Sequence, residues 1–153
     1  GDPQNNCRCS MPQIQKYRSK ISGPLMDRID IHIETPAVKI DELQSEKPGE
    51  SSEQMRTRIL ACREIQKNRY EKFVRNNPTN ATIPQKHMDN ICEIGDNEKA
   101  LLKKAMKQLS LSARAYNKIL KVSRTIADLE HSINIQSQHL LEAIQYRSLD
   151  RNL

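Results

Sequence analysis

The sequence is poor in aromatic residues: its 153 residues include no Trp, one Phe and four Tyr. Strands draw heavily on aromatic and β-branched side chains, whereas Leu, Ala and Met suit helices. With 36% of its residues hydrophobic, a chain of this length can still bury a sizeable core. The composition therefore predicts a mainly helical protein and argues against a β-sandwich.

Long apolar runs are missing as well. No stretch approaches the roughly 20 apolar residues of a membrane-spanning helix, and no basic segment followed by an apolar one resembles a secretory leader. The cysteines are too few and too scattered for a disulfide framework. We therefore expect a soluble, cytoplasmic protein with no membrane partner. The sequence begins with Gly and not Met, and we expect it to be a fragment of a longer protein.

Self-contained catalytic motifs are absent too. The sequence has no G-x-x-x-x-G-K-[ST] phosphate loop, no G-x-S-x-G and no H-E-x-x-H. Cys7 and Cys9 resemble half of a thiolate zinc site, but no complementary pair follows them, and Cys62 and Cys92 read as small core residues. We predict no metal site and do not expect the isolated chain to be an enzyme.

The first 35 residues combine a short helix and a single strand. Apolar residues recur at helical spacing within residues 13–22, and Gly23-Pro24 then ends the helix. In residues 29–34, isoleucines alternate with polar residues, which predicts a half-buried strand. One strand is not stable alone, and no other stretch alternates comparably. We therefore expect its partner strands to lie upstream of this chain.

The remainder of the chain predicts a linker followed by a helical bundle. Residues 36–50 are rich in proline and acidic residues, which is typical of a connecting loop. We therefore divide the chain into residues 1–35, 36–50 and 51–153. The last part has apolar periodicity for four to five helices: 52–75, 84–93, one capped by Asp96, one capped by Ser110 or Ser112, and one opened by Ser137. In the first of these, one apolar arc contains Met55, Ile59, Cys62, Ile65, Tyr70 and Phe73.

The helix that follows Ser112 carries the clearest basic feature of a chain whose net charge is +6. Its apolar arc includes Ile119 and Ile126. The opposite arc is a mostly basic stripe, formed by Arg114, Lys118, Lys121, Thr125 and Asp128. Arg114 lies in the first turn, where free amides and the helix dipole favour an anion such as phosphate. The alternative is a solvated face on which Arg124 and Asp128 form a minor ion pair worth a few tenths of a kcal/mol.

Arg28 is flanked by Asp27 and Asp30, just after Gly23-Pro24. The two carboxylates can hold its guanidinium in a fixed direction, and planar, bidentate geometry suits an arginine that contacts phosphate. A structural ion pair at the entrance of a strand explains the same residues. Gln66 is a polar residue within an apolar arc, and we expect it to form a buried hydrogen bond to the backbone.

Four motifs in this order, SGPLMDRID, SARAY, RTIADL and EAIQYR, together resemble the C-terminal part of magnesium-chelatase-like AAA+ ATPases of the bacterial ComM (YifB) type. The resemblance covers nearly the whole chain. It implies that residues 1–35 are the end of an ATPase core and that residues 51–153 are its helical lid. The core's phosphate loop and acidic pair would lie upstream of Gly1.

The resemblance also assigns roles to two arginines. Arg28 matches the arginine finger that reaches the ATP of a neighbouring subunit, and Arg114 matches the lid arginine, called sensor two, that contacts the γ-phosphate. Asp27 and Asp30 would then orient the finger. Lys118 and Lys121 would support the site or contact nucleic acid. The family's Cys-Pro-Cys turn, which precedes Cys7 and Cys9 in the complete pattern, is missing here, which leaves the role of these two cysteines open.

The parent protein is accordingly expected to bind ATP and Mg²⁺ and to form a homo-oligomeric ring, a hexamer, that acts on DNA in recombination and transformation. No ligand is expected on this fragment alone. Two alternatives stay open. One is a stand-alone basic helical module that binds nucleic acid through Lys118, Lys121 and the arginines of residues 52–75; the other is a protein-interaction bundle without a ligand.

Overall fold

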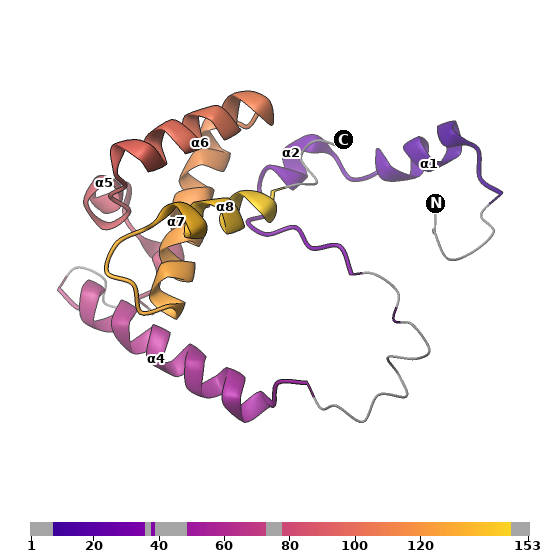
Figure 1. Ribbon diagram of the computed structural model, residues 1–153. Helices are drawn as coiled ribbons and strands as arrows, with labels where there is room; N and C mark the ends of the chain where they lie inside the picture. The colour runs from indigo at the N-terminus through magenta and orange to yellow at the C-terminus, as the bar shows by residue number, and fades with distance from the viewer. Residues whose placement is uncertain (1–7, 36–37, 39–48, 73–77, 148–153) are drawn as a thin grey trace.

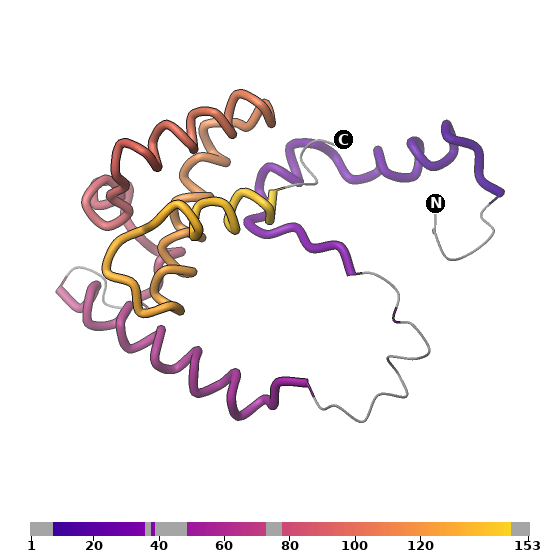
Figure 2. Tube along the Cα trace, in the orientation of Figure 1, coloured from indigo at the N-terminus to yellow at the C-terminus, as the bar shows by residue number. Residues whose placement is uncertain are grey.

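A computed structural model describes residues 8–35, 38, 49–72 and 78–147 of the chain. As predicted, the fold is mainly α, and no strand occurs among the described residues. Figures 1 and 2 show α4, α5, α6, α7 and α8 gathered in a bundle, with α1 extending away from it. In chain order the elements are α1 (Met11–Arg18), α2 (Gly23–Met26), α4 (Ser52–Tyr70), η1 (Asn80–Thr82), η2 (Gln85–His87), α5 (Met88–Ile91), α6 (Asp96–Gln108), α7 (Ala113–Leu129) and α8 (Ser137–Gln145).

Helix α7 is the centre of the bundle and packs against α8, α4 and η1. It begins where the Ser112 hydroxyl accepts a hydrogen bond from the Ala115 amide at 3.1 Å, an N-cap that satisfies one of the free donors of the first turn. It ends where His131 adopts a left-handed backbone and the Ser132 amide donates to the Ala127 carbonyl at 2.8 Å. The predicted apolar arc is confirmed, since its residues are buried on α7: Ala115, Ile119, Leu120, Ile126 and Ala127.

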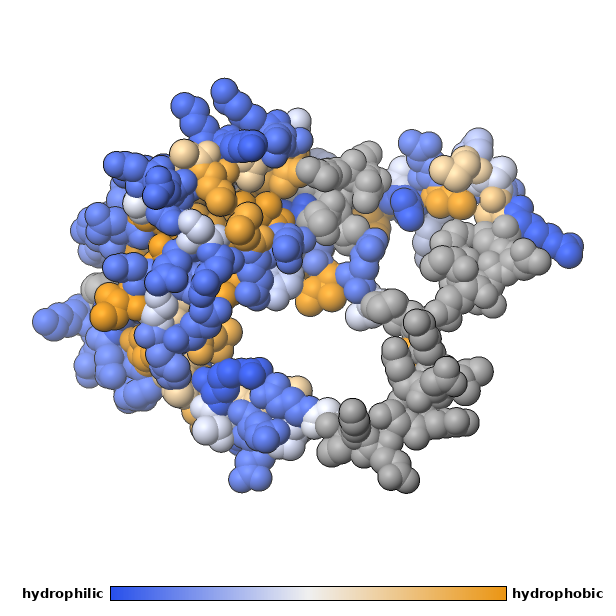
Figure 3. Space-filling view, in the orientation of Figure 1, coloured by the Kyte–Doolittle hydropathy of each residue, from blue (hydrophilic) through white to orange (hydrophobic). Residues whose placement is uncertain are grey.

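The hydrophobic core lies where α7 meets the other helices of the bundle. Tyr70, Met88, Leu102 and Leu140 are among its fully buried members, and they come from four different helices. Cys62 and Cys92 are buried, as predicted. The space-filling view shows apolar side chains gathered between hydrophilic helix surfaces (Figure 3). The core therefore fixes the direction of α7, which carries three of the six predicted site residues: Arg114, Lys118 and Lys121.

Two helix predictions need correction. Only the second half of α4 packs on the bundle: Cys62 and Tyr70 are buried, whereas Met55 and Ile59 are 43% and 52% exposed. The apolar arc is continuous in sequence, but α7 ends before it can cover the first two turns of α4 (Figure 1). Phe73 and the end of the predicted helix 52–75 lie outside the described residues. The single helix predicted at 84–93 is a 3-10 turn followed by α5, with Pro84 at the cap in extended geometry.

The predicted strand at residues 29–34 is not found. The segment is irregular; its isoleucines are exposed, whereas His32, predicted to face outward, is 6% exposed. The His32 amide donates to the Tyr146 carbonyl just beyond α8 at 2.8 Å. The alternating pattern fails because no partner strand exists among the described residues, and the end of α8 orients the segment instead.

Two further sequence predictions concern the linker and the membrane. Of the predicted linker at 36–50, only residues 38, 49 and 50 are described. Over the described parts of the chain, no helix combines the length and the apolar content that crossing a membrane requires.

Candidate functional site

The junction between α2 and α7 is organised by the Asp27 carboxylate. The short α2 begins at Ser22, whose hydroxyl accepts from the Leu25 amide at 3.3 Å, and Asp27 follows directly at its C-terminal end. The two carboxylate oxygens of Asp27 accept hydrogen bonds from the Ser112 hydroxyl at 2.6 Å and from Nη1 of Arg114 at 2.5 Å. Asp27 therefore joins α2 to the first turn of α7.

The surroundings of Asp27 favour its charged form. The hydrogen bond from Ser112 lowers the pKa of Asp27 most, and the hydrogen bond and positive charge of Arg114 lower that pKa further. The charge of Arg147 also acts in this direction, whereas partial burial opposes it. The carboxylate is therefore an anion seated against the N-terminus of α7, where the helix dipole favours negative charge.

Lys118 makes the second connection, one helical turn beyond Arg114. Its ammonium group pairs with the Asp30 carboxylate and donates to the Arg28 carbonyl at 2.5 Å. The Lys118 side chain is 16% exposed, so the ammonium group lies mostly covered by the segment that it holds. The backbone of Arg28 thus lies directly beside α7, near the predicted anion site.

The Arg28 side chain is exposed, and its partner differs from the sequence-based expectation. Its Nη1 donates to the Pro24 carbonyl of α2 at 2.7 Å. Asp27 and Asp30 do not pair with it; they pair with Arg114 and Lys118 on α7. The terminal carbonyls of a short helix are free acceptors, so a nearby guanidinium folds back onto them. Among the described residues, the Pro24 carbonyl is thus the partner of the Arg28 guanidinium, which lies on the protein surface.

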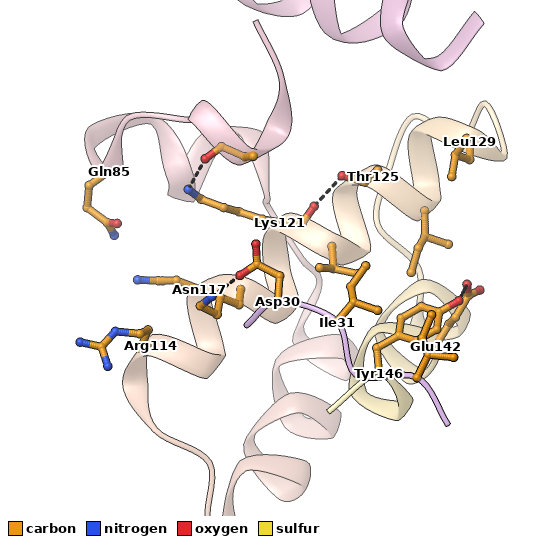
Figure 4. Close-up of a pocket in the computed structure, with 15 residues that line it drawn as sticks. Asp30, Ile31, Gln85, Arg114, Asn117, Lys121, Thr125, Leu129, Glu142 and Tyr146 are labelled. Atoms are coloured by element: carbon orange, nitrogen blue, oxygen red, sulfur yellow. Dashed lines mark hydrogen bonds and ion pairs between the residues drawn. The ribbon is translucent and has the colours of Figure 1, made fainter. Parts of the chain in front are cut away.

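A groove of about 650 Å³ extends along α7 from this junction. Asp30, Asn117 and Arg114 line its polar end, and Leu129 and Tyr146 lie at the opposite, more apolar end (Figure 4). Lys121 lines the groove as well, and its ammonium group donates to the Ala81 carbonyl at 2.9 Å. The three cations of the predicted stripe are therefore all engaged by groups of this chain, and none stands as a simple solvated charge.

The stripe prediction is wrong for Asp128. This residue is 1% exposed and accepts hydrogen bonds from Arg69 at 2.7 and 2.5 Å and from Arg124 at 3.1 Å. The Asn80 amide group adds a donor at 2.9 Å. Two arginines and an amide thus donate hydrogen bonds to one buried carboxylate, and these contacts link α4, η1 and α7. The spacing of Arg124 and Asp128 indicated a pair, but nothing in the sequence indicated Arg69, which lies 59 positions earlier.

Two other polar side chains, those of Gln66 and Tyr70, lie beside this cluster. Gln66 is buried, and its carbonyl oxygen accepts from the Asn80 amide of the backbone at 3.3 Å, as expected. The Tyr70 hydroxyl donates to the Asn80 side chain at 2.5 Å, and burial raises the pKa of Tyr70 to about 12. These contacts anchor η1 to α4. Ala81 belongs to η1, and its carbonyl thereby accepts from Lys121.

No three His, Cys, Asp or Glu side chains among the described residues are placed to hold a metal ion. Cys7 lies outside the described residues, and Cys9 is exposed. Burial raises the pKa of Cys92 to about 11 and also raises the pKa of Cys62. Both buried thiols are therefore held in the neutral form, which suits core residues and does not suit metal ligands.

The sequence matches two families in succession: the one described as magnesium chelatase, subunit ChlI, over residues 1–43, and the one described as magnesium chelatase, subunit ChlI C-terminal, over residues 49–147. It is 42% identical over 147 residues to competence protein ComM of Haemophilus influenzae, and 37% identical over 150 residues to the uncharacterised protein YifB of Escherichia coli. These alignments cover 95% and 97% of this chain but 28% of each relative. The chain thus spans under a third of the length of these relatives.

Proposed function

This chain belongs to the magnesium chelatase subunit ChlI C-terminal family, and from that premise we propose that it is the arginine-finger and lid portion of a ring-forming AAA+ ATPase. In this proposal Arg28 is the finger and Arg114 is the lid arginine that contacts the γ-phosphate. ATP and Mg²⁺ are held by a core that lies outside the 153 residues. The parent forms a ring of subunits, expected to be a hexamer.

The observation that carries the proposal is the bridge between α2 and α7. Asp27 binds Arg114 at 2.5 Å, and Lys118 binds the carbonyl of Arg28 at 2.5 Å. Arg28 and Arg114 therefore belong to one cluster, although 86 positions separate them in the sequence. Two arginines in one cluster can approach the same phosphate group.

The chemistry suits the residues present. Phosphoryl transfer is catalysed mainly by positioning and by stabilisation of charge on the phosphate oxygens, and an arginine finger contributes roughly 10³ to 10⁵ in rate. Arg114 already binds a carboxylate through a charge-assisted hydrogen bond, which is the interaction that a phosphate oxygen would accept. The exposed Arg28 guanidinium is held by one hydrogen bond to the Pro24 carbonyl within the described residues, so it can reach outward.

Subunit geometry follows from the same cluster. This chain has no phosphate loop, so the nucleotide that Arg28 meets must be bound by other residues. We propose that both arginines of one subunit face the ATP of its neighbour, since Asp27 and Lys118 hold them in one unit. The ring is then required for hydrolysis, because a single subunit cannot complete the site.

Turnover of the parent protein tests the proposal. Arg28→Ala and Arg114→Ala, each in the protein that carries the upstream core, should lower ATP turnover at least about a hundredfold while the melting temperature stays close to that of the unmodified protein. Arg56→Ala on the exposed part of α4 is the matched control and should leave turnover unchanged. Near-normal turnover in both arginine variants would reject the proposal.

DNA is the proposed substrate of the ring. The support is the net charge of +6 and the similarity to a relative named as a competence protein. Lys121, Lys118 and Arg114 are engaged within this chain, which weakens the alternative of a stand-alone nucleic-acid module. A titration of the isolated chain with duplex DNA separates the two: the ring proposal needs no binding by the chain alone, whereas a free-standing module must bind and must weaken as salt rises.

A further inference from the structure

We infer that Lys118 and Arg147 are positioning residues: one from α7 and the other from just beyond α8, they hold the successive backbone carbonyls of Arg28 and Ile29 and so restrict the direction of Arg28. This inference rests on the proposed function and adds to it, because the family resemblance assigned no role to Arg147. It also predicts that the arginine finger moves as one body with the lid.

The first clamp is Lys118 on α7. Its ammonium group reaches the Arg28 carbonyl at 2.5 Å and also pairs with Asp30, two residues later. Because α7 is the most buried helix of the bundle, its side chains are fixed by the core. The carbonyl of Arg28 is therefore held by the most buried helix of the bundle.

The second clamp is Arg147, just beyond α8. Its guanidinium donates from Nη1 to the Ile29 carbonyl, and the residue is 1% exposed. Its charge also reaches Asp27, whose pKa it helps to lower. Arg147 is thus fixed in place by burial and aimed at the residue that follows the finger.

A third contact closes the arrangement. The His32 amide donates to the Tyr146 carbonyl at 2.8 Å, so the segment after the finger is tied to the residue that precedes Arg147. The successive carbonyls of Arg28 and Ile29 accept from Lys118 and Arg147. These contacts restrict the backbone of the segment from which the Arg28 side chain extends.

Loss of either clamp should lower kcat more than it changes KM for ATP, because the finger acts in the transition state and a misplacement of about 1 Å costs roughly a hundredfold. The variants are Lys118→Met, which keeps the length of the stem, and Arg147→Lys, which keeps the charge and loses the planar fork. Both are made in the protein with its upstream core. Each should lower kcat at least about tenfold, with KM within about threefold of the original value.

A double-mutant cycle with Arg28→Ala separates positioning from a merely structural role. If the clamps act through Arg28, neither substitution should reduce single-turnover hydrolysis further once Arg28 is already Ala. Arg69→Lys is the matched control, because it perturbs a partly buried arginine of the lid that contacts Asp128 and not the finger segment. Its effect on turnover, of whatever size, should be the same in both backgrounds.

The outcomes are distinct. Normal turnover of Arg28→Ala overturns the finger itself, and the positioning inference with it. A damaged Arg28→Ala protein together with normal Lys118→Met and Arg147→Lys proteins overturns only the positioning inference, as does a clamp loss that recurs in full in the Arg28→Ala background. If Arg147→Lys fails to fold, Lys118→Met decides the question alone, since Lys118 is not part of the hydrophobic core.

Discussion

Asp27 makes the contacts that join α2 to the start of α7 in the candidate site. Its carboxylate accepts hydrogen bonds from the Ser112 hydroxyl and from Arg114, so one side chain contacts the cap residue of α7 and directs the Arg114 guanidinium. A phosphate that takes Arg114 must compete with this carboxylate for the guanidinium. The contact therefore holds Arg114 in an ordered position before any nucleotide arrives, which reduces the entropy lost on binding.

The lowered pKa of Asp27 predicts an acid dependence of stability. Its pKa in the folded chain lies below the ordinary 3.8, so the ionised group stabilises the fold above about pH 4, and the benefit is lost as pH falls through the folded-state pKa. The difference in free energy of unfolding between the unmodified chain and Asp27→Asn should be constant near neutrality and should shrink below about pH 4.

Urea unfolding over a pH series measures this difference. Asp96→Asn is the control, because the Asp96 side chain is fully exposed and forms only a surface pair with Lys99 at 3.3 Å. A gap between Asp27→Asn and the unmodified chain that persists unchanged to the most acidic pH at which the fold survives would contradict the assignment.

At the residue scale, the sequence indicated which side chains matter more reliably than which side chains meet. Arg28, Arg114 and Lys118 were singled out by motif and spacing, and all three lie in one cluster. Their partners were not predictable, because Asp27 and Arg114 are 87 positions apart and local charge spacing favoured a pair between Asp27 and Arg28. Nothing in the sequence pattern pointed to a role for Arg147, since burial by a distant segment leaves no periodic signal.

Among the elements, helix α7 contributes one face to the hydrophobic core and the other face to the polar contacts of the candidate site. Its apolar face is the core of the bundle, and its polar face holds the finger segment near Arg114 and the Asp128 cluster near its end. The Asp128 cluster fixes α4 to α7 through Arg69 and therefore sets the angle of the lid. The two clusters therefore lie at different places along one helix.

Replacement of Asp128 should cost far more than a surface ion pair. Asp128→Asn keeps the volume but leaves Arg69 and Arg124 buried without their counter-charge, which predicts a loss of about 3–5 kcal/mol in the free energy of unfolding. Asp96→Asn should cost less than about 0.5 kcal/mol. Chemical denaturation of the isolated chain measures both values, and a loss below about 1 kcal/mol for Asp128→Asn would show that the cluster does not hold α4 on α7.

The periodicity of the sequence was sufficient to predict the helices that form the core. It was not sufficient where no neighbouring element covers an apolar face. The period of 3.6 residues located α6, α7 and α8 to within a few residues. It overestimated the buried length of α4, because an apolar arc predicts what a face prefers and not whether a neighbour covers it. The period of two residues at 29–34 predicted a strand, yet a strand needs partner strands that the described residues do not supply.

At the scale of the whole molecule, side chains join α2, α7 and the end of α8, so the segment that carries Arg28 is attached to the helical bundle. Asp27, Lys118 and Arg147 make the three connections. A ring built from such units would carry a change in the lid of one subunit directly to the nucleotide of the next. The account therefore places Arg28 and Arg114 of one subunit at the same neighbouring ATP.

Mixed rings test this placement most directly. Subunits with Arg28→Ala and subunits with Arg114→Ala, each in the protein with its upstream core, are inactive alone and are combined at equal amounts before ATP turnover is measured. As a positive control, Arg28→Ala subunits mixed with subunits that lack the phosphate-loop lysine should recover activity, because some interfaces are then complete. The account predicts no recovery for the Arg28→Ala and Arg114→Ala mixture, since every interface lacks one of the two arginines; recovery comparable to that of the positive control would contradict it.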